Sequence, residues 1–165
     1  MSDIQGNSRL QEWEVRSLVD CMAGLWSHNQ QRYELGWNNV MQIQTQRILG
    51  GLTAAFNMLV MRSAERGELP EDPAVAIDNL TQIAMMVPQD LGLAPDELME
   101  VIDQSLSIDQ EPVVEQILLD PVAFFARIVG AYAAFIAWEA KLEGTPKEQL
   151  AERHLAATAL PAFVA

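Results

Sequence analysis

One long apolar run constrains this chain more than any other feature of its sequence. Almost every residue from Val122 to Trp138 is apolar, with Asp120-Pro121 before the run and Gly144 a short distance after it. Aspartate followed by proline is typical of a helix start, and glycine is typical of its left-handed cap. The run is about 17 residues long and contains Arg127, so it is short and charged for a membrane span. We therefore predict a buried helix and no membrane partner.

Similar signals recur along the rest of the chain. Apolar residues stand three and four positions apart, and capping residues, proline or glycine separate these stretches. No segment combines strand-length alternation with hairpin turn residues. These patterns predict an all-α bundle of about six or seven helices. The predicted helices cover residues 9–29, 37–64, 73–87, 95–106, 111–119, 122–142 and 145–160.

Three local details are predicted within this pattern. Asn7 or Ser8 caps the first helix. The polar stretch 28–36, which contains a glycine, breaks or kinks the chain, unless the helices on either side form one long bent helix. Thr145 and Glu148 have the spacing of a capping box and begin the last helix.

Length and composition favour one folded domain over residues 1–165. Half of the residues are apolar, so a core can form despite a net charge of −13. Within the domain we expect a long helical pair (9–66), an acidic lobe of short helices (67–120) and a C-terminal helical hairpin (121–160).

Charge is distributed unevenly along the chain. Residues 67–120 contain thirteen aspartates and glutamates and no lysine, arginine or histidine, whereas the segments on both sides are balanced. The whole net charge therefore lies in this segment. Asp96, Glu100 and Asp103 stand at i, i+4 and i+7, so they share one face of a predicted helix.

Two explanations of the acidic segment stay open. Surface carboxylates keep proteins soluble, and several here stand at helix starts, where the dipole favours them. However, like charges without an intervening cation repel each other, which suggests a basic partner surface. The partner is then a protein with a basic surface. This surface can be a nucleic-acid-binding groove, which the carboxylates would enter by imitating phosphates. Direct binding of nucleic acid needs a basic footprint and is not expected. The candidate partner-binding residues are Asp96, Glu97, Glu100, Asp103, Asp109, Glu111 and Glu115.

Residue types that perform catalysis or bind metals are too few or badly spaced. The chain has two histidines, His28 and His154, and one cysteine, Cys21. Cys21 and His28 stand seven residues apart, about 10 Å along a helix, which is too far for a thiol–imidazole hydrogen bond. No glycine-rich phosphate loop occurs. We predict a non-enzymatic protein with no metal or cofactor, an inert buried thiol and a reducing, cytoplasmic location.

Arg127 is the residue of the apolar run that needs a separate explanation. An interior guanidinium must be paired, reach water or bind an anion. One interpretation is an ion pair with an acidic residue, or a side chain that extends to the surface. The other is an anchor for a carboxylate or phosphate in an apolar pocket, with Tyr132 as a second candidate anchor.

The N-terminal helices carry more apolar residues than one buried side requires. Met41, Met58 and Met61 lie outside their main apolar stripes, which predicts a homodimer through these helices. The predicted function is that of an adaptor, inhibitor or assembly factor whose acidic lobe docks on a basic partner. The alternative is a small-molecule-binding bundle with an apolar pocket anchored by Arg127.

Overall fold

The computed structural model describes residues 9–42, 45–106, 111, 115 and 118–160. Over these residues the fold is all-α, as predicted, and the one extended pairing is an isolated antiparallel bridge between Arg9 and Ala159. The helices are α2 (Glu12–Ser27), α3 (Gln30–Gln42), α4 (Thr45–Glu65), α5 (Pro73–Ala84), α6 (Pro95–Leu106), α8 (Pro121–Glu143) and α9 (Lys147–Ala157).

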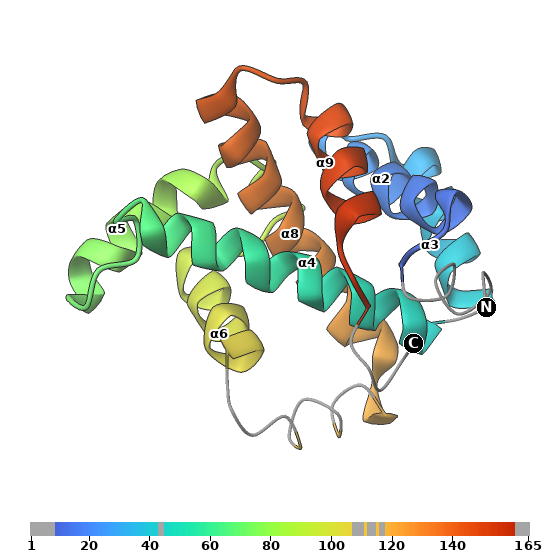
Figure 1. The fold of residues 1–165 in the computed structure, drawn as a ribbon, viewed down its shortest axis with the longest axis horizontal. Helices are drawn as coiled ribbons and strands as arrows, with labels where there is room; N and C mark the ends of the chain where they lie inside the picture. The colour runs from blue at the N-terminus through green and yellow to red at the C-terminus, as the bar shows by residue number, and fades with distance from the viewer. Residues whose placement is uncertain (1–8, 43–44, 107–110, 112–114, 116–117, 161–165) are drawn as a thin grey trace.

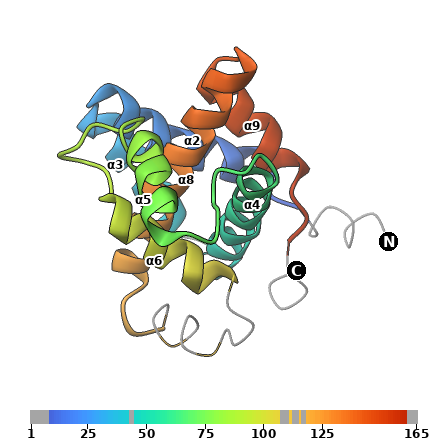
Figure 2. The same cartoon turned by 90° about the vertical axis from the view of Figure 1, so that its left-hand side faces the viewer.

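Helix α8 is the centre of the bundle and contacts α2, α4, α5, α6 and α9. In Figure 1, α4 crosses the molecule from side to side, with α5 and α6 towards one end and α2, α3 and α9 towards the other. Figure 2 views the α5–α6 end, where these two helices pack together. Buried side chains from all these helices form one hydrophobic cluster, in which Phe56 of α4 and Phe135 of α8 meet edge to face.

The predicted helix after Asp120-Pro121 is present as α8. The Asp120 side chain accepts a hydrogen bond from the backbone N–H of Ala123, and Gly144 ends the helix with a φ of 80°. By length and composition the segment Val122–Glu143 could cross a membrane, and 72% of its most apolar window is buried inside the fold. The core helix of a soluble protein meets the same criteria, so this apolarity does not by itself indicate a membrane span.

The beginning of α2 differs from the prediction. The helix begins at Glu12, because Gln11 and Glu14 form a capping box at this position. The predicted start at residue 9 is therefore wrong. The predicted caps, Asn7 and Ser8, lie outside the described residues.

The predicted break between the first two helices falls at His28. This residue has a left-handed φ of 54° and ends α2, and α3 begins at Gln30, so a single bent helix is excluded. The glycine of this stretch does not break the chain. Gly36 lies inside α3, where a Cβ atom would be 2.8 Å from the backbone nitrogen of Cys21 on α2. The glycine therefore permits the close approach of two helices.

The predicted helix over 37–64 is divided between α3 and α4. Packing decides this boundary, because α3 lies along α2, whereas α4 crosses α8 through the contact of Phe56 with Phe135. The predicted helix over 111–119 falls largely outside the described residues.

The predicted capping box of the last helix is wrong. The N-cap of α9 is Pro146, which has no side-chain oxygen, and no side chain caps this end. Because the helix begins at Lys147, Thr145 stands one residue before the N-cap and Glu148 is the second helical residue, so neither occupies its capping-box position. The helix also ends earlier than predicted, at Ala157.

The apolar excess of the N-terminal helices is largely used within the chain. Helix α2 is covered by α3, α8 and α9, and Met41 packs against the core. Met58 and Met61 on α4 are exposed. The homodimer stays a prediction, for which Met58 and Met61 on α4 and Leu35 on α3 still offer exposed apolar side chains.

Candidate functional site

Several carboxylates of the acidic segment are occupied within the protein. Some accept backbone N–H hydrogen bonds at helix starts, where an anion also complements the helix dipole. Others pair with a basic side chain from another part of the chain. The first group is Asp72, Glu97 and Asp120, and the second is Asp90 with His28 and Glu100 with Arg127. Glu97, a predicted partner-binding residue, therefore has a structural role at the start of α6.

The predicted shared face of α6 is present. Asp96, Glu100 and Asp103 are exposed, whereas Leu98 and Ile102 on the opposite side are buried in the core. We call Asp96, Glu100 and Asp103 the α6 acidic face. Within the described part of the chain, Asp96 and Asp103 make no hydrogen bond or ion pair, so their charges are directed to solvent.

The remaining predicted partner-binding residues, Asp109, Glu111 and Glu115, do not belong to the α6 acidic face. Glu111 and Glu115 are exposed, and Glu111 has an interaction within the protein. Asp109 lies outside the described residues. On α5, next to α6, Asp78 is a further exposed carboxylate, whose side chain makes no hydrogen bond or ion pair among the described residues.

A pocket of about 200 Å³ lies between α4, α6 and α8. Its lining residues are Thr53, Val101, Gln104, Ser105, Leu119, Asp120, Ala123, Phe124, Arg127 and Ile128. We call it the α4–α6–α8 pocket. The sequence predicted Arg127 here but not the residues from α4 and α6. Thr53 and Ser105 interrupt apolar stripes, which is the signal that could have identified them.

Arg127 both lines this pocket and forms an ion pair. Its Nη2 atom donates a hydrogen bond of 2.9 Å to Oε2 of Glu100. The side chain of Arg127 is 33% exposed and that of Glu100 is 68% exposed, so the pair is at the surface. Exposed pairs of this kind contribute about 0–1 kcal/mol, so Glu100 can exchange Arg127 for another cation at little cost.

Tyr132 is not in this pocket. It is completely buried, and its hydroxyl group lies 3.0 Å from Nδ1 of His154 on α9. Burial, with the nearby charge of Glu139, raises the pKa of Tyr132, and burial, Arg62 and Arg153 lower the pKa of His154 to about 4. The neutral phenol and the neutral imidazole therefore share one hydrogen bond, whose direction depends on the imidazole tautomer. The two candidate anchors, Arg127 and Tyr132, are not brought together.

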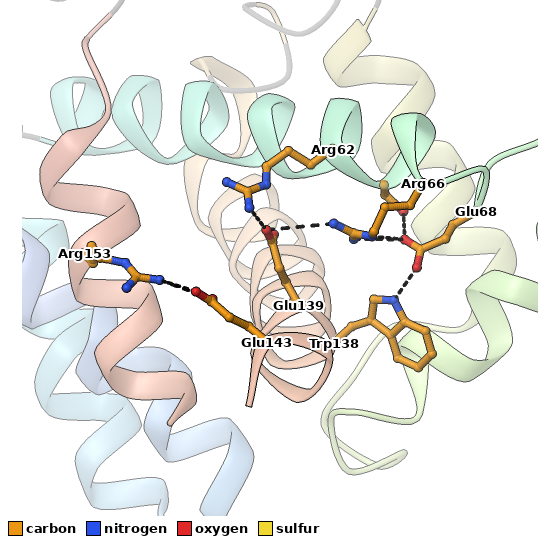
Figure 3. Close-up of polar contacts among 8 residues, drawn as sticks. Arg62, Arg66, Glu68, Trp138, Glu139, Glu143 and Arg153 are labelled. Carbon is orange, nitrogen blue, oxygen red and sulfur yellow. Dashed lines mark hydrogen bonds and ion pairs between the residues drawn. The ribbon is translucent and has the colours of Figure 1, made fainter. Parts of the chain in front are cut away.

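A group of connected polar contacts lies where α4, α8 and the segment after α4 meet (Figure 3). Glu68 accepts hydrogen bonds from the Ser63 hydroxyl at 2.6 Å, the Trp138 indole at 2.8 Å and the Arg66 guanidinium at 2.9 Å. Burial alone would raise the pKa of Glu68, but these hydrogen bonds lower it. Asn79 of α5 also donates to the Glu68 backbone carbonyl. We call this group, with Arg62 and Glu139, the α4–α8 junction.

Glu139 occupies the interior of the junction. Its side chain is 6% exposed and pairs with Arg62, and Arg66 lies 3.9 Å away (Figure 3). Burial raises the pKa of Glu139, and the two arginines offset this only in part. Glu139 is thus held by ion pairs, although neither of its buried carboxylate oxygens accepts a hydrogen bond within the described residues. The junction joins α4, α8 and the segment after α4, and we interpret it as structural.

A metal-binding cluster and a reactive thiol are not found among the described residues. No group of three or more histidine, cysteine, aspartate or glutamate side chains there could hold a metal ion. Burial, with the charge of Asp20, raises the pKa of Cys21 to about 12, so this thiol is not a nucleophile at neutral pH.

Comparison with protein-family models, with curated proteins and with solved structures found no match for this chain.

Proposed function

We propose that this chain is a non-enzymatic interaction protein whose α6 acidic face docks on a basic partner. One observation carries the proposal. Asp96 and Asp103 are exposed on helix α6 and form no ion pair among the described residues. The segment 67–120 contains no cation to neutralise them. Attraction of this kind acts mainly on the association rate and is screened over about 8 Å at physiological salt.

Charge reversal tests this proposal. We expect the double variant Asp96→Lys/Asp103→Lys to lose most of its binding to a fluorescently labelled lysine-rich peptide at low salt. The matched control is Glu71→Lys/Asp78→Lys, which makes the same change in net charge at and before α5. Equal losses in both variants would mean that the peptide reports net charge only and would contradict docking on α6. If a captured partner binds nucleic acid, competition with that nucleic acid tests phosphate imitation.

A small-molecule site is a second candidate, favoured by the position of Arg127 in the wall of an apolar pocket. In that function an anionic ligand would displace Glu100 from Arg127. A ligand that binds only the folded state raises the melting temperature. We would therefore expect a carboxylate such as decanoate to stabilise the native protein but not Arg127→Ala.

A further inference from the structure

The α4–α6–α8 pocket has the size of an anchor site for one side chain. Its volume of about 200 Å³ is below the roughly 300–1,000 Å³ of pockets that enclose drug-sized ligands. It is closer to an engineered cavity of roughly 150 Å³ in another protein that holds benzene. A pocket of this size fits one aromatic or branched apolar group.

The polar atoms of the lining are largely satisfied without a ligand. Thr53 donates its hydroxyl hydrogen bond to Leu49 at 2.8 Å, and Ser105 donates to Ile102 at 3.0 Å, both to backbone carbonyls of their own helices. The walls offer mainly apolar contact, so a polar ligand would lose hydrogen bonds to water without replacement.

Exposed apolar residues continue from the pocket onto the surface. Leu119 lines the pocket and is 85% exposed, and its neighbour Leu118 and the nearby Val122 are also exposed. Exposed apolar side chains that gather beside a pocket are typical of an interaction site.

Charge decides which kind of occupant fits. Arg127 is the cation among the lining residues, and Glu100 already neutralises it. Asp120 also lines the pocket, and the chain has no lysine, arginine or histidine from residue 67 to residue 126. An anionic ligand would approach against this negative field, whereas a cationic partner would be attracted.

We infer that the α4–α6–α8 pocket receives an apolar side chain from a lysine- or arginine-rich amphipathic helix, whose cations lie against the α6 acidic face. This inference rests on the proposed function and names the chemistry of its partner. An amphipathic helix presents apolar anchors three and four residues apart between its charged residues. One such helix can therefore supply both an apolar anchor and cations to adjacent surfaces.

The test uses the whole chain and designed peptides. The main probe is a fluorescein-labelled peptide of leucine and lysine in an amphipathic pattern, about 18 residues long, so that a helix can form. Two further peptides replace its leucines with alanine or its lysines with glutamate. On the protein, Ala123→Trp fills the pocket, and Ala126→Trp adds the same side chain to the same helix at an exposed position outside the lining.

We expect the leucine–lysine peptide to bind the wild type and the Ala126→Trp variant with similar Kd values. Ala123→Trp should weaken binding by about 10-fold to 100-fold, as expected from the loss of one buried anchor. The alanine peptide should bind the wild type more weakly by a similar factor, and the glutamate peptide should not bind. In the unmodified protein, the methyl NMR signals of Val101 and Ile128 should shift on peptide binding, whereas those of the core residue Leu80 should not.

Three outcomes would overturn the inference. The first is equal binding of the leucine–lysine peptide to Ala123→Trp and the wild type, with both folded. The second, which applies also if Ala123→Trp does not fold, is that the methyl signals of Val101 and Ile128 in the unmodified protein do not shift when the peptide is added. The third is stabilisation by decanoate that requires Arg127, without binding of the leucine–lysine peptide, which would assign the pocket to an anionic small molecule.

The two proposals can fail separately. If Asp96→Lys/Asp103→Lys abolishes peptide binding and Ala123→Trp does not, docking on the α6 acidic face stands and the pocket inference is wrong. If neither variant alters binding, both are wrong. If Ala123→Trp alone weakens binding, the pocket is a peptide site, but the α6 acidic face is not its partner surface.

Discussion

The α4–α8 junction and the α6 acidic face use carboxylates in opposite ways. In the junction, Glu68 and Glu139 are withdrawn from water and surrounded by arginine, serine and tryptophan donors. On α6, Asp96 and Asp103 face solvent without a partner in the described part of the chain. The comparison shows that a charge run along the sequence is not a uniform surface in space, since Glu68 belongs to the acidic segment and yet holds two helices together.

The largest expected difference between the two regions comes from Glu68→Ala. This change removes the acceptor of the Ser63, Arg66 and Trp138 hydrogen bonds and leaves the buried hydroxyl of Ser63 without its partner. We expect a loss of about 3 kcal/mol in the free energy of unfolding, measured by urea denaturation. Glu65→Ala, at an exposed position on α4, is the control and should change stability little. Equal stabilities of the two variants would contradict a structural role for the junction.

The pH dependence of stability comes next in size. Because His154 is buried as a neutral imidazole with a pKa of about 4, the unfolded chain takes up its proton near pH 6.5 while the folded protein does not. The contribution of the neutral His154 imidazole to the free energy of unfolding is therefore complete above pH 6.5 and is lost as the pH falls towards 4. We expect His154→Gln to reduce the loss between pH 7 and pH 5 by about 1 kcal/mol, after allowance for solvent screening. A pH profile of His154→Gln that matches that of the wild type would contradict this account.

A smaller effect, of opposite sign, is expected from Glu139→Gln. The pKa of Glu139 is raised in the folded protein, so its charged form opposes folding at neutral pH, and this opposition is relieved as the pH falls. The glutamine variant should be equally stable or more stable at pH 7, by less than about 1 kcal/mol, because Arg62 and Arg66 can reach water. Glu68→Gln should be destabilised under the same conditions. A similar destabilisation of both would mean that the junction does not distinguish its two carboxylates.

The smallest effect is expected on the exposed carboxylates. Asp78→Lys and Asp103→Lys should each change the free energy of unfolding by no more than about 0.5 kcal/mol. The sign should favour the variants at low salt, since a cation reduces repulsion within the acidic segment, and the gain should vanish at high salt. Urea midpoints at two salt concentrations measure this. A larger loss would show that these aspartates have structural partners.

Local signals in the sequence predicted the elements whose ends are set by their own residues. Helices α5, α6 and α8 begin where proline follows a capping residue or opens the first turn, and α8 ends at a glycine as expected. Boundaries set by neighbouring helices could not be predicted. Gly36 looks like a helix breaker in sequence, but inside α3 it provides room for α2, which no local pattern records.

The candidate site also combines one feature that local sequence signals predict with another that tertiary packing sets. The shared face of Asp96, Glu100 and Asp103 follows from helical periodicity alone. The pocket does not, because its walls come from three helices that are distant in sequence, and the Arg127 partner, Glu100, is separated from it by the whole 101–126 stretch. A sequence can show that an interior cation needs a partner, but tertiary packing chooses which carboxylate provides it.

The bridge between Arg9 and Ala159 places two distant parts of the chain in backbone contact, and the Arg47 guanidinium also bonds to the Arg9 carbonyl. The chain from Arg9 to Ala159 therefore forms a closed loop, in which the bridge brings the first and last residues together. A ring can be opened elsewhere and joined at the bridge without moving its helices, provided that the new opening is exposed and makes few contacts. The turn around Gly144, between α8 and α9, meets this condition, so a circularly permuted chain cut there would keep the pocket and the α6 acidic face on one continuous segment.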